Sequence, residues 1–153
     1  MQSSYAASFF SNIEFPFETR PEAAPIEVLL VEDNTDAAWS YMFNLTGDGA
    51  EQFHLEWVPN LLEAMTRLAQ PGIQVVLLDL GLPETTGFKS FLAVDAAAKG
   101  KIPVVVLTSD ESRDSRGLTL SYGASAYLIK DKVSPARLRA TLLKAVTRGR
   151  LST

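Results

Sequence analysis

The sequence contains no cysteine, which excludes disulfide bonds, thiolate metal sites and cysteine nucleophiles. The absence also fits a protein that works in a reducing cytoplasm. Histidine is almost as scarce, since His54 is the only one. We expect it to be a surface residue of an edge strand, and a catalytic dyad or metal site built from histidines of this chain is excluded.

Long apolar runs and an excess of basic residues are missing as well. No apolar run approaches the length that spans a bilayer, and no Lys or Arg precedes a continuous apolar core as in a signal peptide. We therefore expect a cytoplasmic protein without membrane association. The formal charge is 14 − 18 = −4 with no long basic run, so binding of nucleic acid by this chain is not expected. The 153 residues, 46% of them hydrophobic, suit one soluble globular domain.

The first 25 residues differ in character from the rest. They combine several prolines and serines with four phenylalanines and show no regular period: Phe9, Phe10, Phe15 and Phe17. This composition predicts a poorly ordered N-terminal arm over residues 1–25. The alternative is an arm that docks its aromatic rings on this domain, on a second copy or on a partner. Residues 26–149 are predicted to form the domain and residues 150–153 a short tail.

From Ile26 onward, short apolar runs alternate with helical patterns, which indicates an α/β fold with a parallel sheet. The predicted strands are Val28–Val31, Phe53–Val58, Val75–Leu78, Val104–Leu107 and Ala126–Ile129. The predicted helices cover about 34–45, 60–69, 88–98, 112–122 and 134–148, with Asn34 and Asn60 as N-caps of the first two.

Hydrophobic periodicity predicts which helix residues face the core. The expected inward residues are Leu61, Met65, Leu68 and Ala69 in the second helix, Phe88, Phe91 and Leu92 in the third, and Leu138, Leu142, Ala145 and Val146 in the last. The fourth helix has few inward candidates, namely Leu118 and Tyr122, or Leu120. It also contains Gly117, which costs about 1 kcal/mol relative to alanine, so we predict that it is the least stable helix.

Asp79 ends the run Val75–Leu78, whose unbroken aliphatic residues are typical of a central strand buried on both faces. The crevice beyond the carboxyl ends of such strands is where open α/β sheets bind ligands. Taken alone, Asp79 could equally cap the turn that follows. Three other strand ends favour a site: they carry Glu32 and Asp33, Thr108 and Ser109, and Lys130.

Three carboxylates brought close together repel one another unless they share a cation, and oxygen ligands with open positions suit Mg²⁺. Thr108 and Lys130 supply a donor and a positive charge able to hold phosphoryl oxygens. The pattern predicts phosphoryl transfer with Asp79 as the in-line nucleophile. Lys130 could also be a structural ion-pair partner of Asp79.

The chain from Glu27 to about Arg148 resembles the receiver domain of two-component response regulators. The matching segments are Leu-Leu-Val-Glu32-Asp33-Asn34, Leu-Leu-Asp79-Leu-Gly-Leu-Pro83, Val-Val-Leu-Thr108-Ser109 and Tyr127-Leu-Ile-Lys130. The resemblance implies a flavodoxin-like, doubly wound sheet of five strands in the order 2-1-3-4-5 with five helices.

The resemblance also implies how the site works. Asp79 would accept a phosphoryl group from a phosphohistidine of a sensor histidine kinase or histidine phosphotransfer protein. Asp33, Asp79 and the backbone carbonyl of Gly81 would bind Mg²⁺, with Glu32 acting through water. Thr108 and Lys130 would contact the phosphoryl group. Tyr127 would turn inward as Thr108 moves and change the surface made by the fourth helix, fifth strand and fifth helix. That surface would control a downstream protein or a fused output domain, and homodimerisation is left open.

Two positions depart from the family. Asp131 follows Lys130 where proline with a cis peptide is usual; because a cis bond before a non-proline residue costs about 2.5–4 kcal/mol, we expect a trans bond and a rearranged loop. Gly117 stands where receivers commonly carry an aliphatic residue. We therefore expect the fourth helix to be mobile before phosphorylation and to be ordered, or captured by a partner, afterwards.

Three other interpretations compete with the phosphoacceptor. Phosphatases of the haloacid dehalogenase type need a second Asp two residues after the nucleophile, where this chain has Gly81. A flavodoxin-like phosphate binder is disfavoured because Glu32 and Asp33 would repel the phosphate. A degenerate receiver that acts only as a docking module remains as the third. The chain is therefore predicted to be a signalling domain and not a turnover enzyme.

Overall fold

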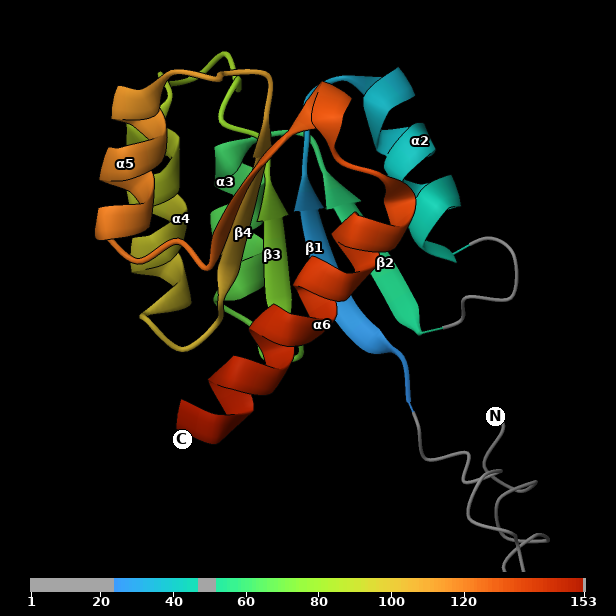
Figure 1. Ribbon diagram of the computed structural model, residues 1–153. Coiled ribbons are helices and arrows are strands. Elements are labelled where there is room, and N and C mark those ends of the chain that lie inside the picture. Colours follow the sequence, from blue (N-terminus) through green and yellow to red (C-terminus); the bar gives the residue numbers. More distant parts are fainter. Residues whose placement is uncertain (1–23, 47–51, 153) are drawn as a thin grey trace, which may run out of the picture.

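The structure, a computed structural model, describes residues 24–46 and 52–152. The predicted arm, apart from its last two residues, lies outside them. The described residues form one five-stranded parallel sheet in the order β2-β1-β3-β4-β5, as predicted (Figure 1). The strands are β1 (Ile26–Val31), β2 (Phe53–Val58), β3 (Val75–Leu78), β4 (Val104–Thr108) and β5 (Ala126–Ile129).

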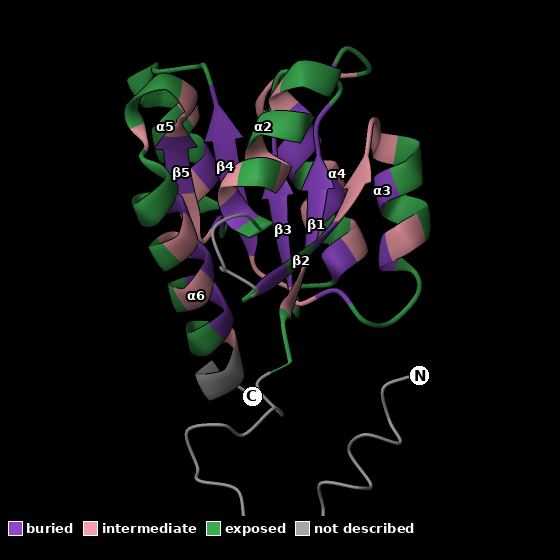
Figure 2. Cartoon of the chain, turned by 90° about the vertical axis from the view of Figure 1, so that its right-hand side faces the viewer, coloured by how far each residue is buried: buried purple, intermediate pink, exposed green. Residues whose placement is uncertain are grey.

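The central strands are buried on both faces because their residues are aliphatic without a polar break. Every residue of β3 and β4 is buried, and so are the last four residues of β1 (Figure 2). The edge strand β2 alternates at its start, with Phe53 and Leu55 buried and His54 exposed between them. The side chain of His54 lies on the surface, with Nδ1 2.7 Å from a carboxylate oxygen of Glu27.

Helices connect the strands and cover the sheet on both sides (Figure 1). Their bounds are α2 (Thr35–Thr46), α3 (Leu61–Leu68), α4 (Phe88–Ala98), α5 (Arg113–Ser121) and α6 (Pro135–Ser152), and a short 3₁₀ turn covers Lys130–Lys132. Side chains cap four of the five N-termini by accepting a backbone N–H three residues on. These caps are Asn34, Asn60, Ser112 and Ser134, and the first two were predicted.

The sheet divides the apolar core into two halves. Side chains of α2 and α6 pack on one face, where Leu138, Leu142, Ala145 and Val146 form the predicted inward stripe of the last helix. Helices α3, α4 and α5 pack on the other face, around the fully buried Phe91. The carboxyl ends of all five strands meet at one edge between these two halves.

Several predicted inward residues point to solvent instead. Met65 is 43% exposed and Leu92 is 40% exposed, while the smaller Ala64 and the nearby Val94 are buried in their place. The buried face of α3 passes through Ala64 and Leu68, and that of α4 passes through Phe91, Val94 and Ala98. Ala69 is exposed because α3 ends at Leu68.

Of the two alternatives predicted for the inward residues of α5, Leu120 is the one that packs against the core. Leu118 and Tyr122 are 42% and 58% exposed, Leu120 is partly buried, and the fully buried residue of this helix is Thr119. The aromatic ring of Tyr122 packs edge-on against Phe88 of α4, with 5.1 Å between ring centroids. This contact lies at the surface, so it did not require Tyr122 to be buried.

The last helix continues past its predicted end. It runs through Gly149, where an added Cβ would lie 3.7 Å from the ring of Pro103, an ordinary van der Waals contact. Among the described residues, no helix is long and apolar enough to cross a membrane.

Candidate functional site

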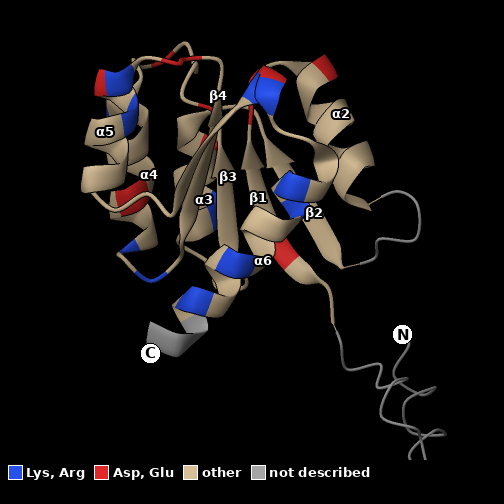
Figure 3. Cartoon of the chain, in the orientation of Figure 1, with Lys and Arg blue, Asp and Glu red and all other residues tan. Residues whose placement is uncertain are grey.

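The strand ends and the loops after them enclose a cleft of about 650 Å³ at the carboxyl edge of the sheet. Its lining brings together residues from β1, β3 and β4 and from the turn after β5. They include Glu32, Asp33, Asp79, Gly81, Thr108, Ser109 and Lys130. Acidic residues are visible beside the ends of β1 and β4 (Figure 3). The register of the parallel strands explains this convergence. Val31 pairs with Leu78, and the next residue in each strand's sequence is acidic, Glu32 after β1 and Asp79 after β3.

Three carboxylates meet inside this cleft. One oxygen each of Glu32, Asp33 and Asp79 lies within 4.8 Å of the other two. Glu32 and Asp79 are 1% and 6% exposed, whereas Asp33 is open to solvent. Hard carboxylate oxygens with one exposed member form a donor set that suits Mg²⁺ together with water. The residues present therefore fit the metal.

Lys130 lies between the two buried carboxylates. Its ammonium nitrogen Nζ is 3.0 Å from Glu32 Oε1 and 3.2 Å from Asp79 Oδ2. The expected trans geometry is confirmed, since the described residues contain no cis peptide, and the 3₁₀ turn that begins at Lys130 still directs the ammonium group into the cleft. The ion pair with Asp79 that the sequence left open is present.

Burial and charge act in opposite directions on these groups. Burial, and then the charge of Asp79, raises the pKa of Glu32 to about 6, although Lys130 and the backbone N–H of Asn34 pull it down. Burial alone would lower the pKa of Lys130, but the hydrogen bond to Glu32 and the charge of Asp79 raise it above its ordinary value. A second cation would relieve the repulsion between the carboxylates that Lys130 neutralises only in part.

Backbone geometry holds the carboxylate of Asp79 in place. Its Oδ1 accepts a hydrogen bond from the N–H of Gly81 at 2.9 Å, while Oδ2 faces Lys130. A Cβ at position 81 would stand 3.4 Å from Oδ1, at the near limit of ordinary van der Waals contact. Glycine at this position therefore keeps the space beside the carboxylate open.

A second set of contacts leads away from the cleft through Tyr127. The Thr108 hydroxyl accepts the N–H of Asp110 at 3.2 Å, and the Tyr127 hydroxyl donates to the carbonyl of Asp110 at 2.8 Å. Tyr127 is only 3% exposed, so its ring lies in the inward position in this structure. Ser115 of α5 completes the set with its hydroxyl 3.0 Å from that of Tyr127.

Sequence reasoning placed the charged residues of the cleft but missed their supporting contacts. The indole N–H of Trp57 donates to the carbonyl of Glu32 at 2.7 Å, and Arg116 donates to the carbonyl of Tyr127 at 3.1 Å. Neither has a local sequence signal, because each depends on which elements the fold brings together. The run Asp110–Glu111–Ser112 directly after a strand end was the one available hint that this loop borders the site.

Comparison with known proteins assigns the chain to a family. The family model of the response regulator receiver domain matches residues 28–143, and the chain belongs to this family. It is 32% identical to the swarming motility regulation protein RssB of Serratia marcescens over 123 residues, which are 80% of this chain and 53% of that protein. The chain thus spans about half the length of that relative.

Solved structures agree with this assignment at the level of the fold. A CheY-like response regulator receiver domain protein from Methanospirillum hungatei superimposes with a TM-score of 0.73 at 19% identity, covering 84% of this chain and 99% of that one. The receiver domain of the sensor histidine kinase PA1611 from Pseudomonas aeruginosa, with a magnesium ion in its active-site cleft, gives 0.68 at 23% identity over 81% and 99%. The chain is a receiver domain of the kind used in two-component signal transduction.

Proposed function

We propose that Asp79 is the phosphoacceptor of this receiver and takes its phosphoryl group from a phosphohistidine of a sensor histidine kinase or histidine phosphotransfer protein. The carboxylate fixed by Gly81 and Lys130 within the acidic cleft is the observation that carries the proposal. Residues 26–149 form the receiver domain in this proposal, and they act in the cytoplasm.

In the transfer, an oxygen of the Asp79 carboxylate attacks the phosphorus atom, the P–N bond to the donor imidazole breaks, and the imidazole leaves and takes up a proton. Lys130 and Thr108 lie in position to hold phosphoryl oxygens, because both line the cleft beside Asp79. Glu32, Asp33, Asp79 and the carbonyl of Gly81 would hold Mg²⁺, which neutralises charge that develops on the phosphoryl group. The receiver domain of PA1611, which resembles this chain in fold, holds a magnesium ion in its active-site cleft, and this supports Mg²⁺ as the metal proposed here.

The phosphoryl group then changes the surface formed by α5, β5 and α6. Thr108, Asp110 and Tyr127 are joined by hydrogen bonds, and Tyr127 contacts Ser115 of α5. A shift of Thr108 toward the phosphoryl group would therefore reach α5 through Tyr127. We propose this surface as the contact for a downstream protein or a fused output domain.

Incubation with acetyl phosphate and Mg²⁺ tests the proposal without a partner protein. Mass spectrometry is expected to show the gain of one phosphoryl group in the native chain and none in Asp79→Asn. Asp110→Asn is the matched control, because it removes a carboxylate that lines the same cleft outside the three-carboxylate cluster. Absence of any gain in the native chain would leave a docking module that works without phosphorylation.

The lifetime of the product separates a receiver from a phosphatase. Gly81 stands where a phosphatase of this type needs its second carboxylate, so hydrolysis lacks a positioned base there. We expect the aspartyl phosphate to persist well beyond a single turnover time of a typical phosphatase. Rapid release of phosphate with repeated turnover would contradict the proposal.

A further inference from the structure

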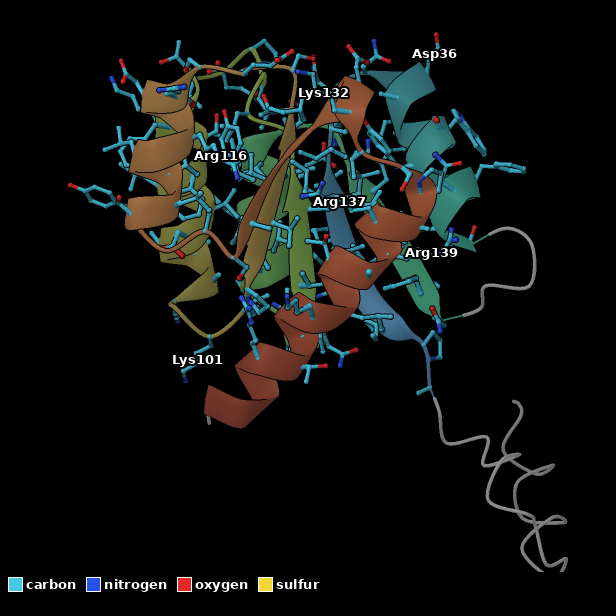
Figure 4. The ribbon with its side chains drawn as sticks, viewed as in Figure 1. Asp36, Lys101, Arg116, Lys132, Arg137 and Arg139 are labelled. Carbon is cyan, nitrogen blue, oxygen red and sulfur yellow. The ribbon has the colours of Figure 1, made fainter. Side chains whose placement is uncertain are left out.

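A basic groove runs along the outer edge of β5, between α5 and α6. It has a volume of about 280 Å³, and its charged lining comes from both helices: Arg116, Arg137, Lys144 and Arg148. Figure 4 shows Arg116 on α5 and Arg137 on α6 to either side of this strand. Four cations in one groove are a concentrated positive charge for a chain of net charge −4. The groove therefore favours an acidic occupant.

The floor of the groove offers backbone groups as well as charge. Within the described part of the chain, β5 has a strand neighbour on one side only. The carbonyl of Tyr127 accepts a hydrogen bond from the Arg116 guanidinium, so this carbonyl points away from β4. The backbone groups of Ile129, two residues further along the strand, point the same way. Such an edge can pair with an extended segment, with Leu120 and Leu128 supplying apolar contacts beside it.

One segment of this chain has the matching chemistry. Residues 13–18 read Ile-Glu-Phe-Pro-Phe-Glu, in which apolar Ile13, Phe15 and Phe17 alternate with Glu14, Pro16 and Glu18. In an extended conformation, the two sets lie on opposite sides. Residues 1–23 hold three acidic residues and one basic residue, so they contribute 1 − 3 = −2 to the charge. Both the period and the charge suit the groove.

We propose that residues 13–18 of the N-terminal arm add to the edge of β5 in the same chain and fill the basic groove. Glu14 and Glu18 then face α6, where Arg137 and Lys144 are separated by two helical turns, about 10.5 Å. The two glutamates are about 13 Å apart in an extended strand, which matches that separation. The phenylalanines face α5. Phe15 and Phe17 supply the N–H groups that pair with β5, so Pro16 lies where no N–H is needed.

The connecting chain is long enough for this placement. Seven residues lie between Glu18 and Ile26, the first residue of β1, and the eight Cα-to-Cα steps can span about 26 Å. A segment paired with the outer edge of β5 lies four strand spacings from β1, a distance of about 19 Å, which is shorter than this span. The arm then covers the α5, β5 and α6 surface until phosphorylation alters Tyr127. This regulatory consequence rests on the proposed function, whereas the docking itself does not.

Because the chain has no cysteine, a single nitroxide label can be attached to Ser11→Cys in the full-length protein. In the unphosphorylated protein, we expect the label to broaden amide resonances of β5 and of the facing turns of α5 and α6. Glu14→Lys/Glu18→Lys should abolish the broadening, and adding Arg137→Glu/Lys144→Glu should restore it. Glu22→Lys/Lys89→Glu is the control that leaves the proposed contacts intact.

Amide hydrogen exchange provides the second measurement. The N–H groups of Tyr127 and Ile129 should exchange about tenfold more slowly in the native chain than in Glu14→Lys/Glu18→Lys. Equal exchange together with no broadening would overturn the proposal and leave the groove to an external partner. Broadening that appears only between labelled and unlabelled chains, with a dimer in sedimentation, would overturn it in favour of a second copy. Phosphorylation is scored separately, by the mass gain at Asp79, and should release the label from the groove.

Discussion

At the scale of single residues, the cleft holds three carboxylates, and the single positive charge of Lys130 neutralises them only in part. Two buried carboxylates share one ammonium group at 3.0 and 3.2 Å, while the third carboxylate is open to solvent. Such an arrangement is costly for folding unless a further cation binds. The same arrangement is useful for function, because the cation and the phosphoryl group then meet a site that is already ordered.

The raised pKa of Glu32 predicts how stability depends on pH without Mg²⁺. The folded state binds the Glu32 proton more tightly than the unfolded state, so its favourable contribution is present below about pH 4.5 and is lost as the pH rises through about 6. Glu32→Gln should therefore raise the melting temperature at pH 7.5 with chelator present. Little difference is expected at pH 4.5, where both side chains are neutral. A lower melting temperature of the variant at pH 7.5 would show that the ion pair with Lys130 outweighs the burial of the charge.

At the scale of secondary-structure elements, one arginine of α3 forms hydrogen bonds to the neighbouring strand β2 and to the turn after the helix. Arg67 Nε donates to both carboxylate oxygens of Glu56 on β2, at 3.0 and 2.9 Å, and Nη1 donates to the carbonyls of Gln70 and Pro71 after the helix. The side chain thus joins a helix end to the neighbouring strand and satisfies two carbonyls of the turn that follows the helix.

Replacement of this arginine should loosen α3. Arg67→Met keeps the aliphatic stem and removes the guanidinium group, and we expect it to lower the free energy of unfolding by about 1 kcal/mol. The expected loss of stability is small because the ion pair between Arg67 and Glu56 is partly exposed to solvent. Urea denaturation measures the change. Arg113→Met, at an exposed position on α5, is the matched control, and an equal loss in both variants would mean that the contacts of Arg67 contribute nothing specific.

Helix α5 is held by fewer internal contacts than its neighbours. Its fully buried residue is Thr119, whose hydroxyl has no hydrogen-bond partner among the described residues. Gly117 lies in its interior, and a Cβ added there would meet no atom within 4 Å. The glycine is therefore not required by packing inside this chain, and its effect is to weaken the helix.

Substitution of Gly117 tests this interpretation. Gly117→Ala should raise the free energy of unfolding by about 1 kcal/mol, because alanine favours the helix and nothing obstructs its methyl group. Gly123→Ala should have the opposite effect, since that residue has a φ of +113°, which alanine adopts only with strain. Thermal denaturation distinguishes the two. A destabilising Gly117→Ala would indicate a close contact that the described residues do not make.

At the scale of the whole molecule, the cleft joins segments far apart in the chain, and a ligand there should stabilise all of them together. We expect Mg²⁺ at 100 times its dissociation constant to raise the free energy of unfolding by about 2.7 kcal/mol. Asp33→Asn should remove most of this effect, because it deletes the exposed ligand of the cluster. Calorimetry with Mg²⁺ and with chelator measures the shift. Equal stabilisation of native chain and variant would place the metal elsewhere.

The strands and the charged residues of the site followed from the sequence, whereas helix orientation did not. The apolar run Val75–Leu78 predicts a central strand because a parallel sheet buries every residue of its central strands. The polar residues after each strand could be placed because the carboxyl ends of parallel strands lie at one edge of the sheet. On α4, Phe91 and Leu92 are adjacent and equally apolar, and only the tertiary contact decides that Phe91 is buried and Leu92 is 40% exposed. The contacts of Trp57, Ser115 and Arg116 depend on the same tertiary choice.

The division of the apolar core by the sheet has a consequence for how the molecule opens. Among residues 24–46 and 52–152, the half formed with α2 and α6 shares no buried side chain with the half formed with α3, α4 and α5, so each can behave as its own cooperative unit. Helix α5 can then unfold or shift at a free energy well below that of global unfolding. Phosphorylation that repacks the half formed with α3, α4 and α5 then leaves the packing of the other half unchanged, so the conformational switch does not require the whole domain to unfold.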